Sequence, residues 1–427
     1  MIKTSVNLVI FFDAHRVISK LSTNQAMDLH SDYPFWMIKD GIKDAFPTLE
    51  ADTKTEVLII GGGISGALIG KHLSEAGLET MIVEKRHIGF GSTSASTAML
   101  QYEIDSPLFK LMATQGVAHA LRSYRICAEA IVKIGNICAK IPGGADFEAH
   151  PSLFYASSEK DAKGIIEPEF RARKLAGFKV KLLSETDIAE QFGFSAPAGI
   201  LSEEGAHVDP YLLTQYLLGR MQQKGCQVFD LTEVDKWKPN AQNIEIKTTK
   251  GHTIRANFVV VACGYESQQY LPKKVTQLNS TFAIASKPMA AKKEFWHKNS
   301  LLWETKTPYL YLRTTSDNRI IVGGRDEEFY DPEKRDQLLP EKRRKLEADF
   351  KELFPDIPFQ TDFAWAGTFA ETKDGLPYIG HYHNPRILFA MGYGGNGITF
   401  SVAASEMLSD LILGKKNKDF ELFSFDR

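Results

Sequence analysis

The sequence predicts an α/β protein that contains a Rossmann-like βαβ unit, and three observations between residues 56 and 85 predict it. Val57–Ile60 is a short run rich in β-branched residues, which is typical of a strand buried on both faces. A glycine-rich loop and a segment with apolar residues at helical spacing follow. A second apolar run, Thr80–Val83, then ends at the acid Glu84. The elements therefore arrive in the order of a parallel βαβ unit.

The loop after the first strand fits the pattern G-x-G-x-x-G. Gly61 permits a tight turn, Gly63 lets the backbone approach a pyrophosphate, and Gly66 lets the helix pack closely on the strand. The N–H groups at the helix start attract phosphate, and Glu84 accepts hydrogen bonds from a ribose 2′-OH. We therefore predict a dinucleotide site; an ordinary βαβ unit with a glycine-rich turn is the alternative. The other residues predicted here are Ile64, Ser65 and Lys85.

Two further segments are typical of cofactor contacts. Gly89–Leu100 is rich in Gly, Ser and Thr, which suits a long cofactor passing beneath it; a surface loop is the alternative. Near the C-terminus, the predicted strand Phe389–Met391 leads into the glycine loop Gly392–Gly397 and then a helix that starts near Ile398. That helix start suits the negative charge of a reduced flavin, and a structural turn is the alternative.

Composition bounds the class of protein. A chain of 427 residues favours two domains, and 43% hydrophobic with 24% charged residues is typical of a globular protein. The net charge of −2 gives no indication of a nucleic-acid partner. No apolar run reaches transmembrane length, and Val6–Phe12 is too short for a signal peptide, so we expect a cytoplasmic protein. Translation from Met27 is an alternative start.

The remaining chain predicts a mixture of helices and strands. The four cysteines show no paired or metal-binding spacing and are interpreted as reduced thiols, mostly buried. The expected elements are a helical stretch from Pro107 to about Lys140, a loop, helix and strand over Gly205–Val234, strands at Ile244–Ile246 and Phe258–Ala262, a hairpin over Thr307–Gly324, and a charged, solvated helix over 338–353.

Six motifs follow one another in the order seen in one family. They are the opening fingerprint, the Ser/Thr-rich loop, "HVDP", "VVACG", "TKDGLPYIG" and "GYGGNGI". Over roughly residues 55–415 the chain resembles the FAD-dependent oxidoreductases of the D-amino-acid oxidase superfamily, such as glycine oxidase and sarcosine oxidase. The lead-in Tyr33–Trp36 is also similar to the γ-glutamylputrescine oxidoreductase branch.

The resemblance implies a Rossmann-like FAD-binding domain interleaved with an α+β substrate domain built on a mostly antiparallel sheet. After an N-terminal extension, 1–50, the FAD domain would comprise 51–107, 200–268 and 360–427, and the substrate domain 108–199 and 269–359. Val234 would contact the adenine through its backbone. Besides the fingerprint residues, the implied FAD contacts are Gly91, Ser92, Thr93, Ala98, Met99, Leu100, Val234, Ala262, Cys263, Gly264, Gly367, Gly394, Gly395, Asn396, Gly397, Ile398 and Thr399.

The activity implied by the resemblance is oxidation of a C–N bond in an amine or amino acid. Hydride passes to flavin N5, and the imine hydrolyses in water. The electron acceptor is O₂ or another molecule. Two alternatives remain open: oxidation of a 2-hydroxy acid, which needs a base for the alcohol proton, and an FAD-binding partner subunit without turnover.

The chain departs from its relatives at positions that bear on this chemistry. Phe369 stands where glycine-oxidase-like enzymes place an arginine for the substrate carboxylate, which leaves Arg313 as the best replacement and Glu371 as an attraction for a cationic amine. Ala95 and Gly367 stand where some relatives attach flavin covalently, so FAD should be non-covalent. The lysine that speeds O₂ reduction is replaced near Ile321. The substrate-side candidates are Gln101, Tyr309, Tyr311, Arg313, Phe369 and Glu371, with Tyr102 beside them.

Overall fold

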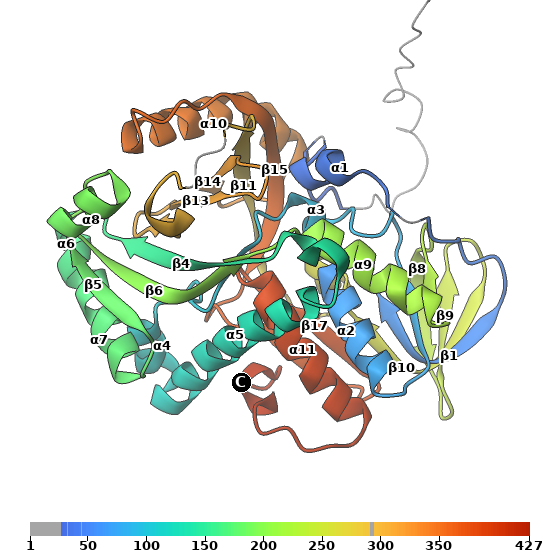
Figure 1. The fold of residues 1–427 in the computed structure, drawn as a ribbon. Helices are drawn as coiled ribbons and strands as arrows, with labels where there is room; N and C mark the ends of the chain where they lie inside the picture. The colour runs from blue at the N-terminus through green and yellow to red at the C-terminus, as the bar shows by residue number, and fades with distance from the viewer. Residues whose placement is uncertain (1–26, 32, 44, 291–293) are drawn as a thin grey trace, which may run out of the picture.

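The computed structural model describes residues 27–427 except 32, 44 and 291–293. The apolar run at Val6–Phe12, and the question of what precedes Met27, lie outside these residues. Two sheets form the framework, and helices cover their faces (Figure 1). The α/β fold that the sequence predicts is confirmed.

The first sheet has eight strands and contains the βαβ unit. Its central strands pair in parallel, and β1 lies between β10 and β2. Helices α2 (Ile64–Glu75), α9 (Pro210–Gln223) and α11 (Gly397–Ile412) pack together on this part of the molecule (Figure 1). The main path is β16 (Tyr378–His381), β17 (Ile387–Met391), β10 (Thr253–Val261), β1 (Thr53–Ile60), β2 (Thr80–Val83) and β7 (Gln227–Phe229), while β8 (Val234–Pro239) and β9 (Ile244–Thr248) extend from β10.

The second sheet has nine strands and is mostly antiparallel. One pair, β12 with β4, is parallel. Its path is β15 (Thr361–Glu371), β11 (Gln277–Ser286), β14 (Ile320–Glu327), β13 (Leu310–Thr314), β12 (Leu301–Glu304), β4 (Glu148–Tyr155), β6 (Ala198–His207) and β3 (Met99–Gln101), with β5 (Val180–Ser184) beside β6. The remaining α-helices are α1 (Phe35–Asp40), α3 (Ser92–Ala95), α4 (Leu108–Gln115), α5 (Val117–Cys138), α6 (Glu159–Asp161), α7 (Glu167–Leu175), α8 (Glu185–Phe192) and α10 (Pro332–Leu353).

Several predicted elements differ from the structure in extent. The single helical stretch expected from Pro107 is two helices, because Gly116 has a φ of +86° and ends α4. The expected loop at Gly205–His207 is the end of β6. Val234 begins a strand where the sequence suggested a strand end. Three strands with residues in the expected FAD segments, β3, β6 and β15, pair within the nine-stranded sheet.

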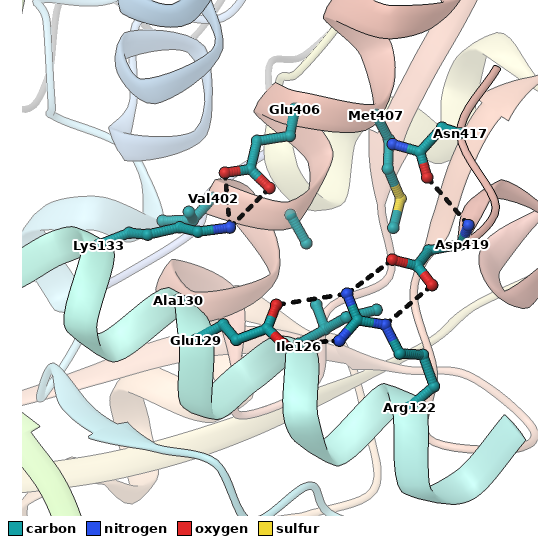
Figure 2. Close-up of a pocket in the computed structure, with 11 residues that line it drawn as sticks. Arg122, Ile126, Glu129, Ala130, Lys133, Val402, Glu406, Met407, Asn417 and Asp419 are labelled. Carbon is teal, nitrogen blue, oxygen red and sulfur yellow. Dashed lines mark hydrogen bonds and ion pairs between the residues drawn. The ribbon is translucent and has the colours of Figure 1, made fainter. Parts of the chain in front are cut away.

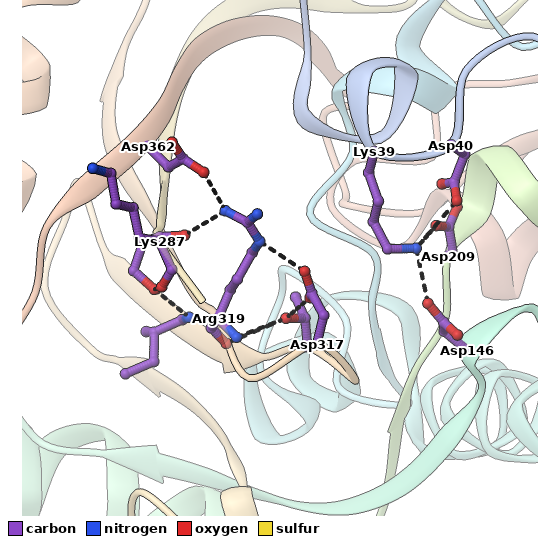
Figure 3. Close-up of polar contacts among 11 residues, drawn as sticks. Lys39, Asp40, Asp146, Asp209, Lys287, Asp317, Arg319 and Asp362 are labelled. Atoms are coloured by element: carbon purple, nitrogen blue, oxygen red, sulfur yellow. Dashed lines mark hydrogen bonds and ion pairs between the residues drawn. The ribbon is translucent and has the colours of Figure 1, made fainter. Parts of the chain in front are cut away.

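The segment before β1 contacts several regions that are distant from it in the sequence. Phe35 and Trp36 of α1 are buried, and the indole N–H of Trp36 donates to the carbonyl of Ser96 at 2.7 Å. Lys39 forms ion pairs with Asp146 at 2.9 Å and with Asp209 at 3.0 Å (Figure 3). These carboxylates together raise the pKa of Lys39 although burial opposes them. The ion pairs therefore hold α1 against the N-terminus of α9.

Two expectations from composition concern membranes and thiols. Within the described ranges, no helix combines the length and the apolar character that a bilayer crossing requires. All four cysteines are free thiols. Cys127 and Cys138 are buried, and burial raises the pKa of each to about 12. These two thiols are therefore protonated at neutral pH.

A buried ion-pair cluster joins α7 to the chain that follows β3. The guanidinium of Arg173 is fully buried and donates to Glu169 at 2.7 Å and to Glu103 at 3.0 Å. Both carboxylates are also buried, and Tyr124 donates to Glu169 at 3.4 Å. Removing one member of such a cluster leaves uncompensated charge in the core.

We predict that Arg173→Met lowers the free energy of unfolding by about 3–5 kcal/mol, because Glu103 and Glu169 lose their buried partner. Chemical denaturation measures the change. Arg171→Met on the same helix is the matched control, since the Arg171–Glu167 pair is exposed and contributes about 0.5 kcal/mol or less. Equal losses in the two variants would show that the buried cluster contributes no special stability.

Candidate active site

A groove with a volume of about 460 Å³ lies at the carboxyl ends of β1 and β2. Parallel α/β sheets bind ligands at this edge. Ten of the predicted cofactor residues line the groove: Gly61, Gly63, Glu84, Lys85, Gly91, Ser92, Thr93, Val234, Cys263 and Gly264. The lining residues that the sequence analysis missed are Met27, Leu29, Ile60, Val83, Arg86, Thr232, Glu233, Asp235, Thr249, Glu266, Gln269 and Tyr270.

The fingerprint glycines are required by the close packing around them. A Cβ on Gly66 would lie 1.9 Å from the carbonyl oxygen of Gly61. Gly61 has a φ of +117°, and a Cβ there would lie 2.5 Å from the carbonyl oxygen of Ala262. Thr93 accepts a hydrogen bond from the N–H of Ile64 at 3.0 Å, which joins the Ser/Thr-rich loop to the start of α2. This arrangement fits the pyrophosphate of a dinucleotide.

Glu84 is held in place by the backbone around it. Its carboxylate accepts hydrogen bonds from the N–H groups of Gly62 and Arg86, each at 2.8 Å. Burial raises the pKa of Glu84, and the two N–H donors oppose that change. A carboxylate fixed beside the fingerprint fits the role of a ribose ligand that the sequence predicted.

A charged cluster in the groove was missed by sequence reasoning. Glu266, which is 3% exposed, pairs with Lys85 at 2.5 Å and with Arg86 at 2.9 Å. The signal available in the sequence was an acid two residues after the small-residue turn at Cys263–Gly264. The cluster leaves both groove cations partnered by one carboxylate.

The second glycine loop meets β3 and β15. The N–H of Gly394 donates to the carbonyl of Ala370 at 3.1 Å. The side chain of Asn396 donates to the carbonyls of Gln101 and Glu103 at 3.2 and 2.8 Å. These contacts bring together the predicted flavin-side segments, which lie far apart in the sequence.

A carboxylate lies against this loop. Asp105 accepts a hydrogen bond from the N–H of Gly395 at 3.0 Å, just before α11 begins. A Cβ on Gly394 would lie 1.9 Å from its Oδ2 atom. The side chain of Asp105 is exposed, and the protein atoms around its carboxyl group raise its pKa to about 6.

Two more acids lie near enough to Asp105 for their charges to act on one another, and we call the region around these three groups the recess. Burial, together with the charges of Glu371 and Asp105, raises the pKa of Asp326 to about 7. The Oδ1 atom of Asp326 is buried without a hydrogen-bond partner. Glu371 is exposed and accepts a hydrogen bond from Asn279 at 3.0 Å. We call Asp105, Asp326 and Glu371 the recess carboxylates.

Tyrosines complete the recess. The rings of Tyr309 and Tyr311 have centroids 5.5 Å apart, and the hydroxyl of Tyr311 lies 3.5 Å from the Oγ1 atom of Thr281. A Cβ on Gly323 would lie 2.3 Å from the Tyr311 ring, so glycine leaves room for that ring. The charge of Asp105 raises the pKa of Tyr265, after the larger effect of burial, which places this unpredicted tyrosine nearby.

Other predicted residues have different surroundings. Arg313 is 1% exposed, and its Nε and Nη1 atoms donate to the carbonyls of Thr97, Ala98, Val208 and Thr314 at 2.9–3.2 Å, so this part of its guanidinium is already engaged. Tyr102 is fully buried and stacks on Phe178, so the suggestion that it lines the pocket is wrong.

The remaining substrate-side candidates lie on strands of the second sheet. Gln101 donates to Ser152 at 3.1 Å, and Phe369 is half-buried opposite Asn279. A Cβ on Gly367 would lie 3.5 Å from the Cβ of Ala95, so the two positions associated with covalent flavin attachment face each other.

A smaller cleft between α5 and α11 does not resemble a binding site. Its volume is about 30 Å³ (Figure 2). Arg122 pairs with Glu129 and Asp419, each at 2.7 Å, and Lys133 pairs with Glu406 at 2.7 Å. The charged groups of this cleft thus neutralise one another and contribute to helix packing.

We predict that Glu84→Gln raises the dissociation constant for FAD by roughly 10-fold, because hydrogen bonds to a charged acceptor are stronger than those to a neutral amide. Titration of the apoprotein with FAD, followed by flavin fluorescence, measures the change. Glu75→Gln on the exposed side of α2 is the control and should leave the affinity unchanged. Unaltered affinity in Glu84→Gln would remove this carboxylate from the cofactor site.

Comparison with known proteins agrees with this geometry. The family model described as "FAD dependent oxidoreductase" (DAO) matches residues 56–411. The γ-glutamylputrescine oxidoreductase of Escherichia coli (strain K12) is 25% identical over 399 residues, which cover 89% of this chain and 88% of that protein. The glycine oxidase of Bacillus subtilis (strain 168) is 28% identical over 383 residues, covering 87% and 97%.

Solved structures show the same fold. The L-proline dehydrogenase from P. horikoshii has a TM-score of 0.73 at 22% identity, covering 87% of this chain and 97% of that one. The L-amino acid deaminase from Proteus vulgaris has a TM-score of 0.73 at 18% identity, covering 90% and 99%. Since the family model spans most of the sequence, this chain belongs to the DAO family of FAD-dependent oxidoreductases.

Proposed function

We propose that the protein oxidises the C–N bond of a positively charged amine rather than that of a simple α-amino acid. The observation that carries this proposal is the group of recess carboxylates, Asp105, Asp326 and Glu371, beside the second glycine loop. Among the described residues, no lysine, arginine or histidine is ion-paired with any of the three. Lys342, whose charge reaches Asp326, is itself paired with Glu327.

The same surroundings disfavour a substrate carboxylate. An α-amino acid needs a cation for its carboxylate, usually the planar fork of an arginine. Phe369 offers no donor, and Arg313 is 1% exposed with its Nε and Nη1 atoms bonded to four backbone carbonyls. A carboxylate in the recess would meet like charge, whereas an ammonium group would be attracted by the carboxylates and by the tyrosine faces.

Bound FAD would supply the acceptor for the hydride and electron pair that leave the C–N bond. The residues of the chain would position the amine: the recess carboxylates attract its charge, and Tyr309 and Tyr311 exclude water around its carbon chain. A substrate with two amino groups suits this arrangement, because one nitrogen can lose its proton and react while the other stays charged against Asp326 or Glu371.

Anaerobic bleaching of the flavin tests the reaction class. The donors are putrescine, γ-glutamyl amines, butylamine, glycine, sarcosine, proline and 2-hydroxy acids. We expect diamines to bleach the flavin faster than butylamine, and glycine to bleach it least. Air admitted afterwards separates oxidase from dehydrogenase. Bleaching by 2-hydroxy acids alone would establish alcohol oxidation, and a flavin that no donor reduces would favour a partner subunit without turnover.

We predict that Asp326→Asn and Glu371→Gln each raise KM for the best diamine roughly 10-fold or more, because each removes a charge that holds the substrate cation. Steady-state kinetics measure the change. The control Glu328→Gln alters an exposed acid two residues beyond Asp326 and should leave KM within about twofold. Equal KM values in all three variants would contradict the assignment of the recess.

We also predict that a quaternary alkylammonium ion, which is charged at every pH, binds more tightly as the pH rises from about 5 to about 8. Asp105 and Asp326 have pKa values raised to about 6 and about 7, so both are largely neutral at the lower pH and ionised at the higher one. Perturbation of the flavin absorbance measures binding. In Asp326→Asn the rise should be smaller and centred at lower pH; binding that does not change with pH would contradict the prediction.

A further inference from the structure

Two histidines and a glutamate gather on the second sheet, away from the recess carboxylates. Glu148 and His150 lie on β4, and His207 ends β6. In the antiparallel register Glu148 lies opposite His207, which in turn lies opposite Met99 of β3. The Oε2 atom of Glu148 is 3.2 Å from the Nε2 atom of His150 and 3.7 Å from the Nε2 atom of His207. All three candidate ligand atoms lie within 4.8 Å of one another.

His207 is the residue that this cluster leaves unexplained. It is 1% exposed, and neither of its ring nitrogens has a hydrogen-bond partner. A buried polar group without a partner lowers the stability of the fold. A bound cation that accepts the lone pair of one ring nitrogen would relieve part of this loss at His207. Its ring centroid is 4.6 Å from that of His150, at an interplanar angle of 32°, so the two rings lie side by side.

His150 is already oriented for coordination. Its Nδ1 atom lies 3.0 Å from the carbonyl oxygen of Lys298. Donation of the Nδ1 proton to that carbonyl fixes the tautomer in which Nε2 carries the free lone pair. Metal-binding histidines commonly have such a partner on the other nitrogen. Nε2 then points its lone pair toward the space that it shares with Glu148.

We propose that Glu148, His150 and His207 bind a divalent transition-metal ion of the Zn²⁺ class. Two imidazoles and one carboxylate are suitable ligands for such an ion, with a fourth position left for water. Metal–ligand distances of about 2.1 Å in tetrahedral geometry separate neighbouring ligand atoms by about 3.4 Å. The two distances from Glu148 lie on either side of that value, so small side-chain movements would complete the site.

The position of the site indicates a structural role. Coordination would join β4 to the end of β6, and His150 would connect the ion to the turn that contains Lys298. His207 pairs in register with Met99, which is among the predicted flavin contacts. The positive charge of Arg313 lies near His207 and opposes the binding of a metal cation there. The exposed carboxylate of Glu148 supplies the compensating negative charge.

The test is metal binding by the intact FAD-loaded protein, and its readout does not depend on the amine substrate. The protein is treated with a chelator, dialysed and titrated with Zn²⁺, and bound metal is counted by elemental analysis. Co²⁺ is then substituted, and its ligand-field bands are recorded at wavelengths beyond the flavin absorption. We expect one ion per chain, a tetrahedral Co²⁺ spectrum and a higher melting temperature with Zn²⁺.

Variants decide whether these three residues are the ligands. Glu148→Gln alters a half-exposed surface side chain and is expected to fold; it should weaken Zn²⁺ binding at least 10-fold. His207→Asn and His150→Gln should do the same and abolish the Co²⁺ spectrum. The control His383→Gln changes an exposed histidine elsewhere and should bind as the wild type does. Binding of less than one ion per chain, or equal affinity in the wild type and Glu148→Gln, would overturn the proposal.

Discussion

The buried guanidinium of Arg313 joins distant segments of the chain around the second sheet. It donates to carbonyls of the segment before β3, of the residue after β6 and of β13 itself, and it lies 5.3 Å from the ring of Trp36. Burial lowers the pKa of Arg313 to about 10, so the group remains cationic at neutral pH. The carbonyls, together with the nearby charges of Asp209 and Asp146, stabilise it where water does not reach. Together with the pairing of β3 with β6, these bonds hold the segment that leads into β3.

The bonds of Arg313 to backbone carbonyls affect which charges are left in the recess. The Nε and Nη1 groups of Arg313 could bind a substrate carboxylate only by leaving buried carbonyls unpaired. Lys342 is likewise engaged, by Glu327 and by the carbonyl of Arg325. Arg313 and Lys342 therefore both bond to groups of the protein itself. The recess beside the second glycine loop contains carboxylates and tyrosines. This distribution of charge supports the proposed preference for a cationic amine.

The sequence predicted the elements whose signals are local. Thr80–Val83 has the same bounds in both, and the fingerprint turn follows from glycines whose Cβ atoms would overlap the backbone. The recess could not be predicted, because Asp105 and Asp326 are separated by more than 200 residues and only strand pairing brings them together. The hydrogen bonds of Arg313 could not be predicted either, because most of their acceptors are distant from it in the sequence. A residue type indicates which contacts are possible, whereas the fold determines which of them are already made.

The cofactor groove and the recess differ in how their charges are paired, and the difference has a physical consequence. In the groove, Lys85 and Arg86 both pair with Glu266, so the pyrophosphate would be bound mainly by backbone N–H groups and the start of α2. In the recess, negative charge is unbalanced by any described ion pair. The groove is also lined by Glu84, Glu233 and Asp235, so the recess differs from it in having no paired cation among the described residues, and not in the sign of its charge. The absence of a paired cation beside the second glycine loop is what supports the proposed attraction of a cationic amine to the recess.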